Sequence, residues 1–164
     1  MPSTYEKIAT NTLSSAAATV TFSSISGTYT DLVLVMNIVP ESNAGGQNCL
    51  LRFNGDTGSN YSFTWLLGSG TITESERRSN QTSIGRIDFY TTTVPTTAIV
   101  SINNYANTTT YKTTLARSSV ADAATRANVG LWRNTAAINE IIILIDSGNF
   151  GVGATFTLYG IKAA

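Results

Sequence analysis

Short runs in which apolar and polar residues alternate recur along most of the chain. In segment 18–23, Val20 and Phe22 fall on one side of an extended backbone, and the intervening threonines fall on the other. Segment 155–159 repeats the pattern with two apolar residues between threonines. A period of two is typical of a β-strand that has one buried face and one solvated face. The alternation therefore predicts half-buried strands.

Runs of this kind are separated by turn residues, mainly glycine, asparagine and serine. The segments that we predict to be strands are 5–9, 18–25, 31–39, 49–54, 61–67, 83–90, 98–105, 112–117, 128–132, 139–145 and 155–161. No segment has the period of an amphipathic helix, so we expect at most one helical turn, around 121–127. Many short, evenly spaced strands predict an all-β sandwich or barrel.

Two predicted strands, within 32–36 and 141–145, are apolar at every position. A strand that is apolar on both faces needs cover beyond its partner sheet, and a loop, an N-terminal arm or another subunit could supply it. Large aromatic residues in other strands favour the same interior or interface positions. The residues that we predict to be core or subunit contacts are Leu32, Leu34, Met36, Trp65, Trp132, Ile141, Ile143 and Ile145.

The turns and the length of the chain indicate one domain. Asn54-Gly55 favours a tight hairpin turn, because a type I′ turn needs positive φ at both central residues. Segment 68–81 gathers four charged residues and is predicted to be an exposed loop at one end of the fold. We expect residues 16–164 to form a single sandwich domain, preceded by residues 1–15 as an arm or an edge strand.

Charge is scarce and balanced. Charged residues make up 12 % of the 164 residues, with ten basic and ten acidic, against about 25 % in an ordinary domain. Without clustered Lys and Arg, we expect no nucleic-acid partner. A net charge near zero favours association with other proteins. The longest apolar runs are far below the ~20 residues that span a bilayer, and the start of the sequence does not have a signal-peptide pattern.

Candidate chemistry is sparse. The chain has no histidine, which excludes a Ser-His nucleophile and removes the commonest metal ligand. The ten carboxylates stand mostly at turns and strand ends, where capping explains them. Cys49 is expected to be a buried, inert thiol, and segment 54–60 has one carboxylate, so a turn is favoured there over a calcium loop. We therefore predict no catalytic, cofactor-binding or metal-binding residue, and no enzymatic activity.

Several segments carry a recognisable pattern. Residues 5–10 (Tyr-Glu-Lys-Ile-Ala-Thr) and 16–25 open it, 51–61 (Leu-Arg-Phe-Asn-Gly-Asp-Thr-Gly-Ser-Asn-Tyr) lies in its middle, and 131–139 and 155–162 close it. Together these segments resemble a group of small virion proteins of tailed bacteriophages. The resemblance spans most of the chain and is weakest in the charged segment described above. Its motifs are turns and strands, and they specify no active site.

The resemblance implies a β-sandwich or jelly-roll module that assembles on the phage particle. We expect a single-domain antiparallel β-sandwich, jelly-roll-like and with little or no helix, that acts as a capsid decoration (cement) protein and stabilises the assembled head. The implied partners are further copies of the chain, as a homotrimer, and the major capsid protein. The implied location is the capsid surface, after synthesis in the host cytoplasm. No membrane partner is expected.

The alternative is a tail-fibre or tail-tip module that recognises a glycan on the host surface. For that role, Tyr90 or Tyr105 would provide an exposed platform for stacking on a sugar ring, beside Asn103 and Asn104. The sequence leaves the choice between capsid and tail open.

Overall fold

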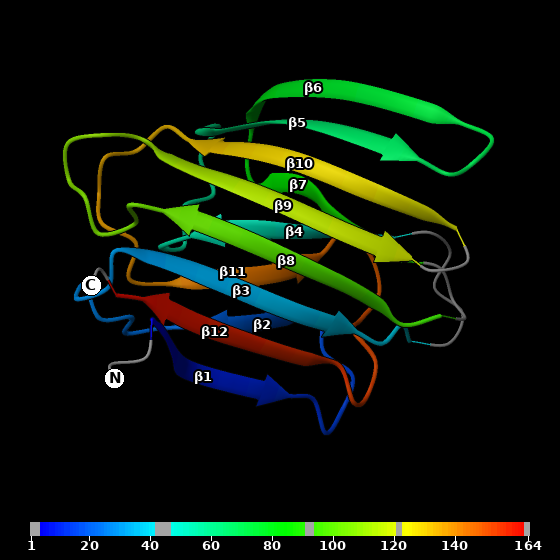
Figure 1. Ribbon diagram of the computed structural model, residues 1–164, viewed down its shortest axis with the longest axis horizontal. Helices are drawn as coiled ribbons and strands as arrows, with labels where there is room; N and C mark the ends of the chain where they lie inside the picture. The colour runs from blue at the N-terminus through cyan, green and yellow to red at the C-terminus, as the bar shows by residue number, and fades with distance from the viewer. Residues whose placement is uncertain (1–3, 42–46, 91–93, 121–122, 163–164) are drawn as a thin grey trace.

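A computed structural model describes residues 4–41, 47–90, 94–120 and 123–162, except for the side chains of residues 89 and 90. Within these residues the chain forms strands and no helix (Figure 1). The strands are β1 (Tyr5–Thr12), β2 (Thr19–Phe22), β3 (Asp31–Ile38), β4 (Gln47–Phe53), β5 (Tyr61–Gly68), β6 (Thr73–Gln81), β7 (Ile84–Tyr90), β8 (Thr96–Asn103), β9 (Lys112–Val120), β10 (Ala124–Trp132), β11 (Ile141–Ile145) and β12 (Thr155–Ile161). The prediction of an all-β, antiparallel sandwich is confirmed.

Eight of these strands form a jelly roll. The pairs β1–β12, β2–β11, β3–β8 and β4–β7 are all antiparallel, so the chain pairs with itself from its two ends inward. Successive pairs alternate between two sheets, which gives the orders β1-β12-β3-β8 and β2-β11-β4-β7. This wrapping of one long hairpin around a core is the jelly-roll topology, as the sequence led us to expect.

Two hairpins are inserted into the roll and lengthen one of its sheets. Hairpin β5–β6 follows β4, and hairpin β9–β10 follows β8. They add β9-β10-β5-β6 to the far side of β8, so that eight strands face four (Figure 1). The edge strand of the smaller sheet, β7, packs against β5, β8, β9 and β10. We call these four added strands the extension.

The core lies between the two sheets. Alternation places every second side chain of β9, from Lys112 to Val120, in the interior, and the same period holds in most other strands. Cys49 is also fully buried, and burial raises the pKa of its thiol. The structure places all the residues predicted as core or subunit contacts inside the chain: Leu32, Leu34, Met36, Trp65, Trp132, Ile141, Ile143 and Ile145.

The second faces of the two wholly apolar strands are buried or half-buried on the outer sides of the sandwich. Val33 is buried and Val35 half-buried on the outer face of the large sheet, and Val33 pairs with Tyr159 of the neighbouring strand β12. Ile142 and Leu144 are half-buried on the outer face of the smaller sheet. Lateral packing between strands therefore supplies part of the cover that the sequence led us to expect from a separate element.

Strand β1 is an edge strand, so residues 5–12 take the second of the two roles considered for the N-terminal segment. The hydroxyls of Thr10 and Thr12 lie 3.1 and 3.3 Å from those of Thr157 and Thr155 on β12. Cross-strand pairs of this kind stabilise an antiparallel sheet on its wet face. They show one use of the many threonines.

Segment 68–81 is not the exposed loop that we predicted, because it forms the end of β5, a turn and strand β6. Gly, Asn and Glu are depleted in strands, and the segment has no alternating apolar positions. Only its pairing with β5 makes it a strand. Edge strands of native sheets are often polar and charged.

The helical turn expected around 121–127 is also wrong for the residues that the structure describes. Residues 124–127 belong to β10, which is paired on both sides, with β9 and β5; residues 121–122 lie outside the described residues. Alanine favours helices in isolation, but two flanking strands override that preference. The tight turn predicted at Asn54-Gly55 is present, because both residues have the positive φ, 52° and 65°, that a type I′ turn requires. It does not join a hairpin, however, since β4 and β5 lie in different sheets.

Candidate functional site

The extension exposes apolar side chains on the outer face of the large sheet, the face that points away from the smaller sheet. Leu66, Leu115 and Val129 are 58, 55 and 54 % exposed. Leu115 pairs with Val129, and Leu66 pairs with Ala127, so these positions lie on neighbouring strands. We call the following residues the outer patch: Leu66, Ile99, Leu115, Ala127, Val129 and Leu131. Clustered apolar side chains on an open face mark a contact surface more often than isolated ones do.

Strand β10 shows why the outer patch is unusual. Its inner positions include Arg126 and Asn128, which are 5 and 1 % exposed, whereas Val129 faces outward and Leu131 is half-buried on the same outer face. An ordinary sandwich strand has the opposite arrangement, with its apolar side chains inside. The reversed polarity of β10 therefore presents aliphatic groups to the surroundings.

An aromatic cluster fixes the end of β10. Trp132 is almost fully buried and stacks on Tyr61, with ring centroids 6.3 Å apart and planes at 16°. The Phe53 ring lies 5.5 Å from Trp132 at a tilt of 53°. These three rings come from β10, β5 and β4, so the cluster joins the extension to the smaller sheet of the roll.

The register of β10 follows from this anchor. Gly130, two residues before Trp132, lies so close to the opposite sheet that a methyl group there would come within 2.7 Å of the Ile84 side chain. With Trp132 and Gly130 turned inward, the period of two turns Val129 and Leu131 outward. Strong packing at one end of the strand thus dictates which side chains the outer face displays.

The segment that superficially resembled a calcium loop serves the same anchor. The carboxylate of Asp56 accepts hydrogen bonds from Trp132 Nε1 at 2.7 Å, Asn60 Nδ2 at 2.9 Å and Gly58 N at 2.8 Å. Burial opposes the ionisation of Asp56, but these three donors outweigh it and lower the pKa of the carboxyl. The turn therefore uses its one acidic group to hold an indole.

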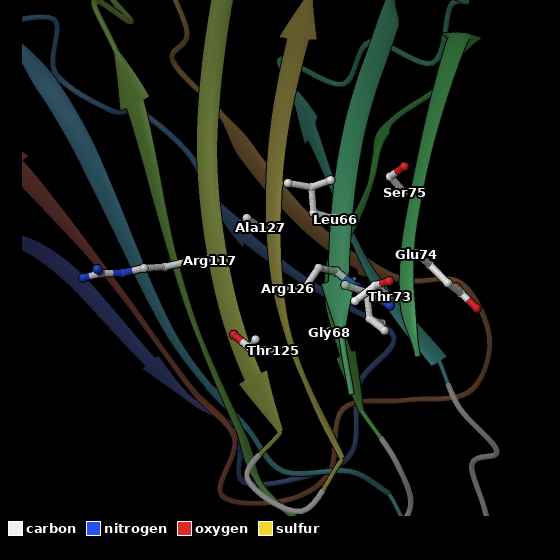
Figure 2. Close-up of a pocket in the computed structure, with 10 residues that line it drawn as sticks. Leu66, Gly68, Thr73, Glu74, Ser75, Arg117, Thr125, Arg126 and Ala127 are labelled. Carbon is white, nitrogen blue, oxygen red and sulfur yellow. The ribbon is translucent and has the colours of Figure 1, made fainter. Parts of the chain in front are cut away.

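A hollow of about 540 Å³ lies beside the outer patch, near the end of the extension (Figure 2). The residues that line it are Leu66, Leu67, Gly68, Thr73, Glu74, Ser75, Arg117, Thr125, Arg126 and Ala127. A methyl group on Gly68 would meet no other heavy atom within 4 Å. The small residues Gly68 and Ala127 thus leave space between the aliphatic side chain of Leu66 and the hydroxyl groups of the lining threonines. A hollow of this shape suits a protruding side chain of a partner.

Arg117 borders the hollow from β9. Its side chain extends from β9 toward β8 (Figure 2), where Arg117 lines a smaller depression of about 180 Å³ together with Thr97 and Ile99. The guanidinium can therefore donate hydrogen bonds at the border between the outer patch and the threonine-rich part of the sheet.

A network of polar groups supports the extension from the inner side. The guanidinium carbons of Arg86 and Arg126 lie 5.1 and 5.0 Å from the ring centroid of Trp65. Both arginines donate to Asn48 Oδ1, at 3.2 and 3.4 Å, and Asn48 Nδ2 donates to Asp146 at 2.7 Å. Burial and the nearby Arg86 lower the pKa of Arg126 to about 10. Neither arginine was identified from the sequence.

The glycan platform considered for the alternative function is not present at Tyr105. This side chain is fully buried; its hydroxyl donates to the Ser26 carbonyl and accepts from the Tyr29 amide at 3.4 Å. Burial raises the pKa of Tyr105. The neighbouring Asn103 and Asn104 are exposed, but the side chain of residue 90 lies outside the described part. Only an interior role is therefore available to Tyr105.

The described residues contain no group of three or more His, Cys, Asp or Glu that could hold a metal ion. In the same part of the chain there is no helix with the length and apolarity needed to cross a bilayer. No protein-family model matches the chain, and no curated protein has significant sequence similarity to it. The outer patch and the hollow therefore have to be interpreted from their own residues.

Proposed function

We propose that this chain is a structural protein of a tailed-phage virion, a decoration protein that binds the assembled capsid through its outer patch. The observation that carries the proposed contact is the row of exposed aliphatic side chains Leu66, Leu115 and Val129 on the open face of the large sheet. The resemblance of segments 51–61 and 131–139 to small virion proteins supports the choice of partner. Jelly rolls also build many viral capsid proteins.

The outer patch has the chemistry of a protein contact. Apolar groups at its centre are bordered by hydroxyls and by Arg117, and protein interfaces commonly combine an apolar centre with a polar rim. Burying a half-exposed Leu or Val side chain contributes about 1 kcal/mol, so several such contacts, repeated over many copies, stabilise a lattice. Because a decoration protein binds the assembled shell and not its separated subunits, it shifts the equilibrium toward the shell by mass action.

The test uses phage particles that lack this protein. Purified protein added back to them should bind in hundreds of copies per particle and raise the temperature at which the particles release DNA. A variant with Leu115→Ser and Val129→Ser should bind at least about tenfold more weakly, a loss of about 1.4 kcal/mol or more in binding free energy. Ile161→Ser, on the outer face of β12 away from the outer patch, is the matched control and should bind like the wild type.

Two results would count against the proposal. The first is that particles without the protein survive heat and osmotic shock as well as complete particles do. The second is that the Leu115→Ser, Val129→Ser variant binds as tightly as the Ile161→Ser control. A copy number of a dozen or fewer, together with inhibition of phage adsorption by the free protein, would indicate the tail module instead.

A further inference from the structure

Strand β6 is the free edge of the extension. Its residues pair with β5 on one side, and no strand among the described residues pairs with it on the other. From Thr73 to Arg78 the pairing with β5 is unbroken, so the edge is regular over this length. The opposite edge strand, β1, has a register shift between Lys7 and Ala9. A regular open edge is a template for a further strand, and β6 provides the longer uninterrupted one.

The charges of β6 are ordered along the strand. Glu74 and Glu76 lie in its first half, and Arg77 and Arg78 follow in its second half. When two copies of such a strand pair antiparallel, the acidic half of each lies beside the basic half of the other. A parallel arrangement would place like charges together, which destabilises a sheet. Charges of a single sign would repel a second copy, whereas this order attracts one.

The side chains involved are accessible. Glu76 and Arg78 form an ion pair of 2.8 Å within the strand, and their side chains remain 38 and 45 % exposed. Glu74 shares their face of the strand because it lies two residues before Glu76. In an antiparallel pair, Glu76 of each copy can contact Arg78 of the other, so the two local ion pairs are exchanged for two between strands. Exposed charges lose little solvation in this exchange.

We propose that two copies of this chain pair antiparallel through β6, about a two-fold axis perpendicular to the sheet. The partner is a second copy because the charge order of β6 complements itself. Such a contact uses the same surface on both copies and closes at two. It therefore differs from the trimer that the resemblance implies, which needs another surface, and it does not depend on the virion role proposed above.

The geometry has a consequence for the outer patch. A two-fold axis perpendicular to the sheet leaves inner and outer faces unchanged, so the two outer patches lie on the same side of the joined sheet. A paired molecule can then engage a surface at two points, and the second contact forms at a high effective concentration. The hollow, which borders β6, lies close to the junction in each copy.

The experiment measures self-association by sedimentation velocity at concentrations up to about 100 μM. The wild type is expected to form dimers, and high salt should weaken them because the ion pairs are exposed. An acidic variant carries Arg77→Glu and Arg78→Glu, and a basic variant carries Glu74→Arg and Glu76→Arg. The acidic variant alone, and the basic variant alone, should each self-associate at least about tenfold more weakly than the wild type. A one-to-one mixture of the two should restore dimers, because opposite charges then face each other along the whole strand.

The matched control carries Lys7→Glu and Lys162→Glu, which change the net charge as much as the acidic variant does but lie at the opposite edge of the large sheet, away from β6. It should dimerise like the wild type. Thermal unfolding confirms that each variant is folded. The proposal is overturned if the wild type stays monomeric, if the acidic and basic variants associate as the wild type does, or if their mixture stays monomeric. If the wild type forms dimers but does not bind capsids, the result contradicts the proposed function and leaves the proposed dimer supported.

Discussion

The indole N–H of Trp132 donates a hydrogen bond of 2.7 Å to the carboxylate of Asp56, a residue 76 positions earlier in the chain. This bond connects the last residue of β10 with the turn that follows β4. It therefore joins the inserted extension to the smaller sheet of the jelly roll. Because Trp132 also sets the register of β10, the same contact helps to decide which side chains form the outer patch.

Asp56→Asn should destabilise the fold by about 2 kcal/mol, because a hydrogen bond to a charged acceptor is replaced by a weaker one. Trp132→Phe removes the donor and retains a ring for packing. Urea denaturation of both single variants and of the double variant gives the coupling energy between the two positions. Strictly additive effects would mean that the bond contributes nothing beyond the packing of the indole.

The same carboxylate makes the fold sensitive to acid. Its hydrogen bonds lower the pKa of Asp56 below the ordinary value of 3.8. Folding therefore favours the ionised form, so its contribution is present above the unfolded-state pKa and is lost as the pH falls through the lower folded-state pKa. We expect the free energy of unfolding to fall as the pH is lowered below about 4, and to fall less in Asp56→Asn. Equal slopes for the two proteins would contradict this assignment.

Two glycines of neighbouring strands should differ in how strongly the same substitution destabilises the fold. Gly130→Ala would place a methyl group 2.5 Å from Thr114 Oγ1 and 2.7 Å from Ile84, and overpacking of this kind costs about 1–3 kcal/mol. Gly68→Ala adds the same group at the open hollow, where it should change stability by about 0.5 kcal/mol or less. Thermal unfolding measures both. A similar loss in the two variants would show that the close approach at Gly130 is not limiting.

The charge of Arg126 should matter through Asp88, which is fully buried and accepts a hydrogen bond from Thr96. Attraction between Arg126 and Asp88 partly offsets the burial that lowers the pKa of the arginine. Arg126→Met should therefore destabilise the fold by about 3 kcal/mol, because it weakens the compensation of a buried carboxylate. Adding Asp88→Asn should recover part of that loss in chemical denaturation. No recovery would mean that the arginine acts mainly through its stacking on Trp65.

Tyr61 should ionise late. Burial raises its pKa to about 12, from an ordinary value of 10.0, and its hydroxyl is held by the Phe53 amide at 3.1 Å and the Asp56 carbonyl at 3.2 Å. Because the folded pKa is the higher one, its contribution to stability is complete below about pH 10 and is lost as the pH rises through about 12. Tyrosinate absorbance should show this ionisation near pH 12, and Tyr61→Phe should lose its amplitude while keeping that of Tyr105, whose pKa burial also raises. Titration of every tyrosine near pH 10 in the folded protein would contradict it.

Much of the roll could be predicted because its strands carry local information. In β2, Val20 and Phe22 face the core and the alternating Thr19 and Thr21 face water, as the alternation requires. Strand β12 behaves in the same way. Long-range pairing, in contrast, left no local trace in β6, which has no alternating apolar positions and contains glutamates of low strand propensity.

The site was harder to predict for a related reason. Hydrophobicity alone favours Val129 and Leu131 for the core, whereas the period of two from the predicted core residue Trp132 turns both outward. A signal was nevertheless present, because Arg126 lies an even number of residues before Trp132 and must share its face. Tyr105 was considered as an exposed platform but is buried. Its hydroxyl bonds to backbone groups of a nearby turn, and this allows an aromatic side chain close to the end of a strand to lie in the interior.

Because both hairpins are inserted on the same side of the roll, the residues that maintain the fold and the residues that form the outer patch lie mostly in different strands. The eight strands of the roll pair among themselves from the chain ends inward, whereas the exposed aliphatic residues belong mainly to β5, β9 and β10. Evolution can therefore alter the hairpins, and with them the choice of partner, while the roll and its internal pairing are conserved. Relatives of this protein should diverge fastest in β6 and in the outward positions of β10.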